Sequence, residues 1–129
     1  MRTKDIGLLG ERAAANFLKK QKYKIVAKNE HFSHNELDIV AIHKKSKIIA
    51  FVEVKARSVN DDLYSKFGVP SSSVTKSKQA RTVSAAKAYL CKNTKFKDFQ
   101  PRLDVIEVYL KKDSFEILSI RHIENAFGV

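Results

Sequence analysis

Two runs of alternating apolar and polar residues stand only four residues apart, and they constrain the fold of this chain more than any other feature. The runs cover residues 36–43 and 48–57, and residues 44–47 between them are polar. A period of two with a short polar connection predicts a β-hairpin. In this hairpin, residues whose numbers sum to 91 should lie opposite each other. Asp38 is therefore expected opposite Glu53, with Cβ atoms roughly 5 Å apart.

The pairing of Asp38 with Glu53 predicts a metal site. Like charges directly opposite each other destabilise a sheet unless something neutralises them. Mg²⁺ does so, because it takes oxygen ligands from one or two carboxylates and keeps its other positions for water and phosphate. Lys55 shares the face of Glu53, and its ammonium is expected to orient an attacking water or offset charge on a scissile phosphate. A slip of one residue in register would separate the two carboxylates.

A further carboxylate comes from an N-terminal helix. Apolar residues recur at helical spacing over residues 3–20, and Glu11 sits at the edge of their stripe. Glu11 is expected to lean over the sheet toward the metal, directly or through water. On the first strand of the hairpin, strict alternation places Leu37 on the face of Ile39 and Asp38 on the opposite face.

The remaining pattern predicts a single α/β domain over residues 1–129. Its expected elements are strands at 23–29, 102–110 and 115–120, a second helix capped by Thr75 or Ser73 and running to about residue 91, a polar turn at 31–35, and a long loop at 58–75. Apolar residues on both faces of the strand at 102–110 favour an interior position in the sheet. The order α-β-β-β-α-β-β predicts a central mixed sheet flanked by helices.

The charge of the chain favours an anionic partner. There are 25 Lys and Arg against 14 Asp and Glu, a formal net charge of +11. Such an excess attracts nucleic acid and raises the encounter rate. A lysine-rich surface that only aids solubility is the alternative, and an anionic membrane is a lesser one. Lys78 and Arg81 share a helical face, and Arg57 continues the face of Lys55, so Arg57, Lys78 and Arg81 are the expected nucleic-acid contacts.

Cysteine content and hydropathy give an expected location. The single cysteine excludes an internal disulfide and favours a reducing compartment. No apolar run is long enough to span a bilayer, and Glu11 and Arg12 interrupt the N-terminal segment before a secretory apolar region could form. These features favour the cytoplasm and no membrane partner.

Short motifs spread over nearly the full length give the chain a family resemblance. Asp38, a spacer of 14 residues and then Glu53-Val54-Lys55 resemble the D…ExK signature of the PD-(D/E)XK nucleases. More narrowly, the chain resembles the bacterial YraN-like family of predicted endonucleases, which is related to archaeal Holliday junction resolvases. The matching pieces are Gly10-Glu11 with Ala14, Glu36-Leu37-Asp38, the segment 51–57, the helix with Lys78, the segment 102–106, and Asn125-Ala126-Phe127. The departures are Asn35, where the family usually has glycine, and Leu103, where phenylalanine is more typical.

The resemblance implies a restriction-endonuclease-like fold and a metal-dependent endonuclease that hydrolyses phosphodiester bonds in DNA, including branched or flapped DNA. It implies that Asp38, Glu53 and the Val54 carbonyl bind Mg²⁺ or Mn²⁺. It also implies that Lys55 assists catalysis and that Glu11 supports the metal site. A homodimer is expected by analogy with the resolvases.

Other functions stay open at this level. Asp38 and Glu53 would form a structural ion network if they paired with Lys55 and Arg57. The chain would be a non-catalytic nucleic-acid-binding adaptor if it kept the nuclease fold without turnover. RNA is a third possibility that the sequence leaves open, although DNA is the favoured nucleic acid.

Three charged residues are placed outside the expected site. Glu36 is interpreted as a solvated strand residue. Arg102 and Asp104 share a strand face, so a local salt bridge is their expected role.

Overall fold

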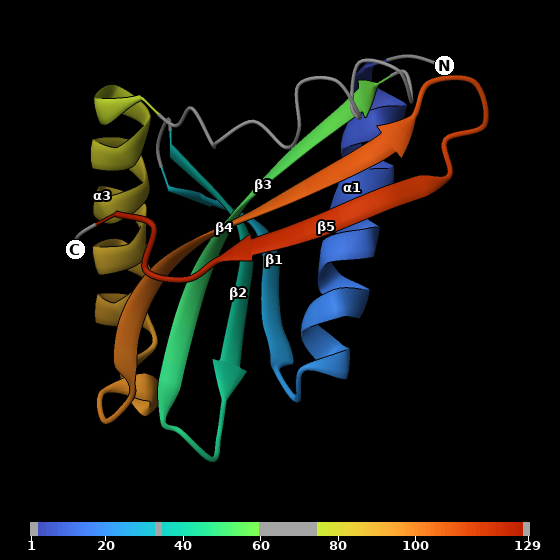
Figure 1. The fold of residues 1–129 in the computed structure, drawn as a ribbon. Helices are drawn as coiled ribbons and strands as arrows, with labels where there is room; N and C mark the ends of the chain where they lie inside the picture. The colour runs from blue at the N-terminus through green and yellow to red at the C-terminus, as the bar shows by residue number, and fades with distance from the viewer. Residues whose placement is uncertain (1–2, 33–34, 60–74, 128–129) are drawn as a thin grey trace.

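Two α-helices, one short 3-10 helix and a five-stranded sheet make up the described part of the chain. The computed structural model describes residues 3–32, 35–59 and 75–127. Its elements are α1 (Thr3–Lys20), β1 (Lys24–Phe32), β2 (Asn35–His43), β3 (Ile48–Val59), α3 (Lys76–Lys92), the 3-10 helix η1 (Thr94–Phe96), β4 (Gln100–Lys111) and β5 (Ile117–Ile123). This is the expected α-β-β-β-α-β-β order, consistent with a restriction-endonuclease-like arrangement (Figure 1).

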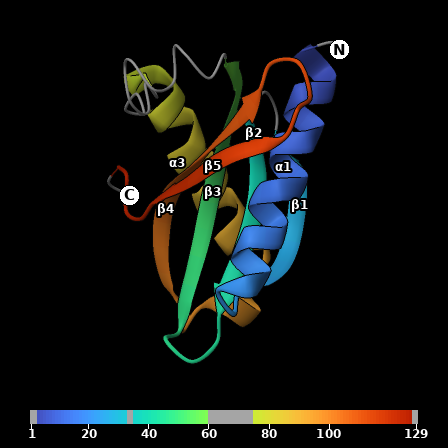
Figure 2. The ribbon, with the colours of Figure 1, turned by 45° about the vertical axis from the view of Figure 1, so that its right-hand side comes forward.

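The sheet is mixed, and its strands lie in the order β1-β2-β3-β4-β5. Neighbouring strands run antiparallel except β3 and β4, which run parallel and have α3 between them in the chain. A parallel pair needs a long crossover of this kind. α1 covers one face of the sheet and α3 covers the other (Figures 1 and 2). β4 has a neighbour on each side, which confirms the interior position expected from its apolar faces.

Each face of the sheet has its own hydrophobic core. The core under α3 includes Val40, Phe51, Ala85, Tyr89 and Val105. The core under α1 includes Ala14, Leu18, Ile39, Val52 and Ile106. Successive residues of β3 alternate between the two cores, because the side chains of a strand point to opposite faces in turn. β3 is therefore buried on both sides and fixes the positions of the strands next to it.

The beginning of α3 is set by a side-chain cap. Thr75 has extended backbone, and its hydroxyl oxygen accepts a hydrogen bond from the Lys78 N–H at 3.1 Å. This confirms Thr75 as the cap; Ser73, the other candidate, and most of the loop expected at 58–75 lie outside the described residues. Neither helix of the described ranges is long and apolar enough to cross a membrane.

The polar turn expected at residues 31–35 is wrong for His31, Phe32 and Asn35, which belong to strands, and residues 33–34 lie outside the described residues. His31 pairs with Glu36 and Phe32 pairs with Asn35, so β1 and β2 stay paired almost up to their connection. The alternation typical of a strand does not reach the end of β1, because the register shifts near Ile25 and polar side chains occupy most of the second half of the strand.

The last strand is displaced from its expected range of 115–120. Phe115 has a left-handed backbone with φ 57°, and its N–H donates to the Lys111 carbonyl, which closes a turn. β5 therefore begins at Ile117 and extends to Ile123.

The alternation on β2 is broken at Asp38, so the face expected for Leu37 is wrong. Leu37 lies in the core under α3 together with Val40, whereas Ile39 lies under α1. Across from this point, Asn29 of β1 has a left-handed backbone with φ 52°, a conformation that interrupts a regular pleat and that Asn tolerates better than most residues. The irregularity gives Asp38 a position between the two faces.

Gly10 allows α1 to approach the sheet closely. A Cβ atom added to Gly10 would meet the Ala56 Cβ at 2.4 Å, whereas one added to Gly7 would meet nothing within 4 Å. We expect Gly10→Ala to lower the free energy of unfolding by about 1–3 kcal/mol, because α1 must move away from β3. Gly7→Ala should raise it by up to about 1 kcal/mol through helix propensity. Denaturant unfolding of both variants checks this, and equal effects at the two positions would contradict it.

Candidate active site

Asp38 and Glu53 lie at the point where β2 and β3 stop pairing. The hairpin has the expected register, with paired numbers that sum to 91 from His43–Ile48 to Ile39–Val52. Asp38 and Glu53 occupy the next position, where the ladder ends. Instead of pairing across the ladder, the Asp38 Oδ2 accepts a hydrogen bond from the Val54 N–H at 2.9 Å. The carboxylate therefore sits in the fork between the two strands and bridges them.

The environment of Asp38 disfavours its charged form. Burial, followed by the neighbouring Glu53 carboxylate, raises the pKa of Asp38 from 3.8 to about 7. The Val54 amide and the Lys78 ammonium act in the opposite direction, and Glu11 adds to the rise. A cation between the carboxylates would favour the charged form of both.

Glu53 projects toward α3 rather than toward α1. Its residue is only 5% exposed, and its Oε1 lies 3.4 Å from the Lys78 Nζ in the first turn of α3. Lys78, which we expected as a phosphate contact, therefore belongs to the carboxylate cluster itself. The ion network expected as an alternative had Lys55 and Arg57 as partners, whereas among the described residues Glu53 forms its ion pair with Lys78.

Glu11 joins the cluster from α1, and two residues not expected in the site connect it to the strands. With its side-chain nitrogen turned toward the carboxylates, Asn29 donates to Glu11 Oε1 at 2.8 Å and to Glu36 Oε1 at 3.2 Å. Burial raises the pKa of Glu11; Lys28 lowers it and Glu36 raises it. Glu36 lies two residues before Asp38 on β2, and this spacing is the feature of the sequence that could have predicted its position near the site.

The expected basic residues surround this cluster at different depths. Half-buried Lys55 lines a space of about 310 Å³ together with Glu11, Asp38 and Val54. Exposed Arg81 lines a smaller space of about 110 Å³ with Asn35, Glu36, Lys78 and Thr82. Exposed Arg57 lies beyond Lys55 on β3; burial raises the pKa of Glu107, and Arg121 and then Arg57 lower it.

The oxygen atoms of this cluster suit a hard divalent cation that keeps part of its water. Among the described residues, no group of three or more His, Cys, Asp and Glu side chains is arranged to hold a metal ion. Mg²⁺ does not require such a cage, because it binds through one or two carboxylates together with water and phosphate. Partly buried Asp38 and buried Glu53 meet that requirement, because their carboxylates are close enough for the charge of Glu53 to raise the pKa of Asp38.

The raised pKa of Asp38 predicts a dependence of stability on pH. The group has a higher pKa folded than unfolded, so its contribution is favourable below about pH 4 and is lost as pH rises through about 7. We expect a loss of about 2 kcal/mol across this window, discounted from the full shift because water reaches the carboxylate. Asp38→Asn should remove this part of the pH dependence, as measured by denaturant unfolding between pH 4 and 8.

Two comparisons make the pH experiment specific. Asp113→Asn, at an exposed carboxylate in the turn before β5, should leave the pH dependence unchanged. Mg²⁺ should restore stability at pH 8 and have little effect at pH 5, because metal and proton compete for the same carboxylate. A wild-type curve that matches that of Asp38→Asn would show that Asp38 has an ordinary pKa.

Comparisons with known proteins place the chain among bacterial relatives along almost its whole length. The model of a family described as "Uncharacterised protein family UPF0102" matches residues 10–108. A UPF0102 protein of Caldanaerobacter subterraneus subsp. tengcongensis is 42% identical over 125 residues, covering 96% of this chain and 95% of the relative. A UPF0102 protein of Clostridium perfringens is 44% identical over 126 residues, covering 98% and 96%. One of Chlorobium chlorochromatii is 37% identical over 130 residues, covering 98% and 94%.

Proposed function

We propose that this chain, which belongs to the uncharacterised protein family UPF0102, is a metal-dependent endonuclease that hydrolyses phosphodiester bonds in DNA. The observation that carries the proposal is the position of Asp38. Its side chain lies in the fork between β2 and β3 and accepts a hydrogen bond from the Val54 N–H. It is also close enough to Glu53 for the negative charge of Glu53 to raise the pKa of Asp38. Buried like charges are costly to a fold, and their clustering beside a lysine is typical of a functional site.

Each residue of the cluster has a role in this chemistry. Asp38, Glu53 and the Val54 carbonyl would hold Mg²⁺ or Mn²⁺, which when bound polarises the scissile phosphate and lowers the pKa of a water. Lys55 offsets negative charge on the phosphate and orients the water for attack. Glu11, whose Oε1 accepts a hydrogen bond from Asn29, would support the metal site directly or through water.

The surface around the fork suits a nucleic-acid backbone. Lys78 and Arg81 lie in the first two turns of α3, and Arg57 is exposed near the end of β3. Together with a net charge of +11, these side chains supply phosphate contacts that position a strand without reading its bases. Recognition by backbone and shape is the reason that branched and flapped DNA are the substrates we propose. Pairing of two sites on two strands would require a homodimer.

The test is cleavage of labelled four-way junction, flap, single-stranded and linear duplex DNA with Mg²⁺ or Mn²⁺. We expect the wild type to cut at least one branched substrate, and chelator or Asp38→Asn to abolish cutting. Cleavage of an RNA strand of the same sequence, measured beside the DNA, tells whether the protein prefers deoxyribose or ribose in its substrate. Cutting that persists in Asp38→Asn would place the activity elsewhere and overturn the proposed site.

A second candidate, a binding adaptor without catalysis, is favoured by one contact. Lys78 already neutralises Glu53, as a structural partner would. If the adaptor reading is right, the wild type binds junction DNA in a salt-sensitive manner but cuts nothing in either metal. Metal binding also distinguishes the nuclease hypothesis from the adaptor hypothesis. A nuclease should bind Mn²⁺, whereas an adaptor whose Glu53 is permanently paired with Lys78 should not.

A further inference from the structure

A second polar cluster is built around Asp104 of β4, which pairs with Val52 of β3. Asp104 is fully buried, and its carboxylate accepts hydrogen bonds from Arg102 at 2.8 Å through both Oδ atoms. It also contacts His122 Nε2 at 2.8 Å and accepts from the Asn125 N–H at 2.9 Å. The expected salt bridge between Arg102 and Asp104 is confirmed, but it is part of a larger network. Asp104 thereby holds an arginine and a histidine in fixed orientations.

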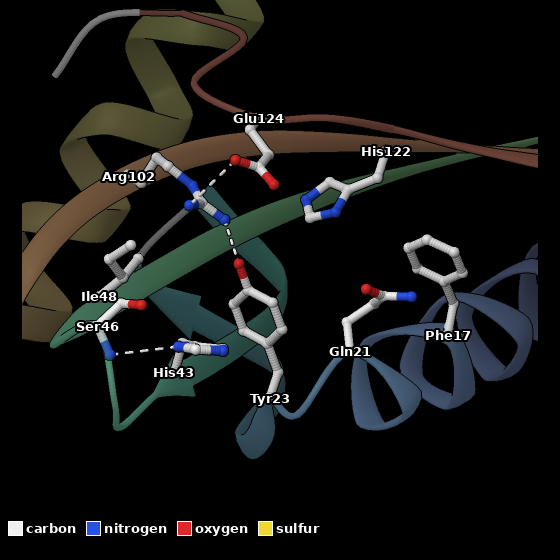
Figure 3. A pocket seen from close by; sticks show the side chains of 9 residues that line it. All are labelled: Phe17, Gln21, Tyr23, His43, Ser46, Ile48, Arg102, His122 and Glu124. Carbon is white, nitrogen blue, oxygen red and sulfur yellow. Dashed lines mark hydrogen bonds and ion pairs between the residues drawn. The ribbon is translucent and has the colours of Figure 1, made fainter.

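The side chains held by Asp104 line a cavity of about 470 Å³ beside the C-terminal end of α1 (Figure 3). Aromatic and imidazole rings surround it: Tyr23 meets His43 with ring centroids 5.1 Å apart, and Phe17 meets His122 at 6.0 Å. The Tyr23 hydroxyl accepts a hydrogen bond from Arg102. Segments far apart in the sequence thus converge on one space, and four of its nine lining residues carry rings.

Hydrogen-bonding groups remain available in this cavity. The Ser46 N–H donates to His43 Nδ1 at 3.3 Å, so the neutral His43 ring carries its proton on Nε2 and presents a donor there. Gln21 is exposed at the end of α1 and adds an amide with both a donor and an acceptor. A planar ligand with donors and acceptors along its edge would match these groups.

A row of lysines borders the cavity on the other side of Tyr23 and His43. The two rings also line a neighbouring space of about 340 Å³, together with Ile42 and the lysines at positions 22, 24, 44 and 45. All four lysines are exposed. Exposed ammonium groups next to a ring-lined cavity form the combination that binds single-stranded nucleic acid: charges follow the backbone, and rings stack on the bases.

The charge inside the cavity disfavours a free anion as its ligand. Arg102 is already paired with Asp104, and the exposed Glu124 carboxylate lies 3.4 Å from the Arg102 NH1. Positive charge that could bind a phosphate lies outside, on the lysine row. We propose that the cavity binds a nucleobase of a single-stranded nucleic acid, with the backbone of that strand on the lysine row.

The position of this base site narrows the substrate class, in a step that rests on the proposed nuclease function. His43 and Asp38 lie five residues apart on β2, so the base site is about 16 Å from the carboxylate fork at about 3.3 Å per residue. Both spaces open beside α1, since Phe17 lines one and Glu11 the other. Where the DNA between the two sites is duplex, at about 3.4 Å per nucleotide, the preferred substrate would carry its unpaired nucleotide roughly five nucleotides from the cut.

Binding of a short single-stranded DNA, compared with an abasic strand of the same length, tests the base site. Measurements in chelator keep binding separate from cleavage. We expect the wild type to bind the base-containing strand about 10-fold more tightly, the size of one stacked base. His43→Ala and Gln21→Ala should reduce this ratio toward one. Lys44→Ala combined with Lys45→Ala should weaken binding of both strands equally, because ammonium groups on the backbone do not sense the base.

Controls distinguish a loss of base binding from a loss of the fold, from a loss of cleavage and from binding of a free nucleotide. Gln21 is exposed, so its variant should keep the wild-type Tm, and Asp38→Asn should keep the wild-type ratio even though its cleavage is lost. If deoxyadenosine monophosphate displaced the labelled strand as strongly as unlabelled strand does, the ligand of the cavity would be a free nucleotide rather than a base within a strand. A wild-type ratio near one, or a ratio unchanged in both His43→Ala and Gln21→Ala, would overturn the base site whatever the outcome of the cleavage assay.

Discussion

Replacing Lys55 with methionine is expected to lower kcat for DNA cleavage by about 10²–10³-fold, the usual effect of removing one group that stabilises transition-state charge. Methionine keeps most of the volume of the half-buried side chain and removes only the ammonium. Negative charge grows on the phosphate as the reaction proceeds, so KM for DNA should change much less than kcat. Rate measurements at saturating DNA, with Mg²⁺ or Mn²⁺, give both constants.

Two variants frame this result. Lys55→Arg keeps the charge but changes its position, and it should recover only part of the rate. Lys112→Ala, at an exposed lysine after β4, should cut at the wild-type rate. Mn²⁺ binding by Lys55→Met should stay at least as tight as in the wild type, because a positive charge near the metal is removed. A Lys55→Met protein with wild-type kcat would exclude Lys55 from the mechanism.

Removing the carboxylate of Asp104 is expected to have the largest effect on stability. Asp104→Ala leaves the mostly buried Arg102 guanidinium without its main partner and frees His122 and the Asn125 amide, at a cost of about 3–5 kcal/mol. Burial alone would raise the pKa of Asp104, but bonds from His122, Arg102 and Asn125 hold that pKa below its usual value. The Tm should fall by about 10–15 °C, as thermal unfolding would measure.

The neighbouring ion pair gives a matched control. Glu124 is 61% exposed and lies 3.4 Å from Arg102, so Glu124→Gln should change stability by no more than about 0.5 kcal/mol. Asp104→Asn keeps the shape of the side chain and should fall between the two variants. If Asp104→Ala proved no less stable than Glu124→Gln, the buried network would not hold β4 and the C-terminal segment together.

The sequence was most informative where its periodicity was regular. The register of β2 and β3 was predictable because both strands alternate with a period of two and only four residues join them, which leaves few pairings that bury both apolar faces. β1 was not predictable to its end. Its register shifts near Ile25, and Asn29 adopts a left-handed backbone, so the alternation fades before the strand does.

Some contacts of the candidate site could likewise be predicted from the sequence, and others could not. Asp38, Glu53 and Lys55 follow from the register of one hairpin, and their proximity could therefore be derived from residue numbers. The bridge from Glu11 through Asn29 to Glu36 depends on how α1, β1 and β2 sit relative to one another. The contact between Glu53 and Lys78 depends on where α3 begins, which follows a segment outside the described residues.

The placement of the parallel pair in the chain has a consequence for synthesis on the ribosome. Asp38, Glu53 and Lys55 all lie within the first 55 residues, whereas β4, which covers the other edge of β3, begins at Gln100. As the chain emerges, α1 and the first three strands can assemble while β3 still presents unpaired backbone groups to solvent. The nascent chain should therefore position Asp38, Glu53 and Lys55 early and be most prone to wrong strand pairing until β4 has emerged.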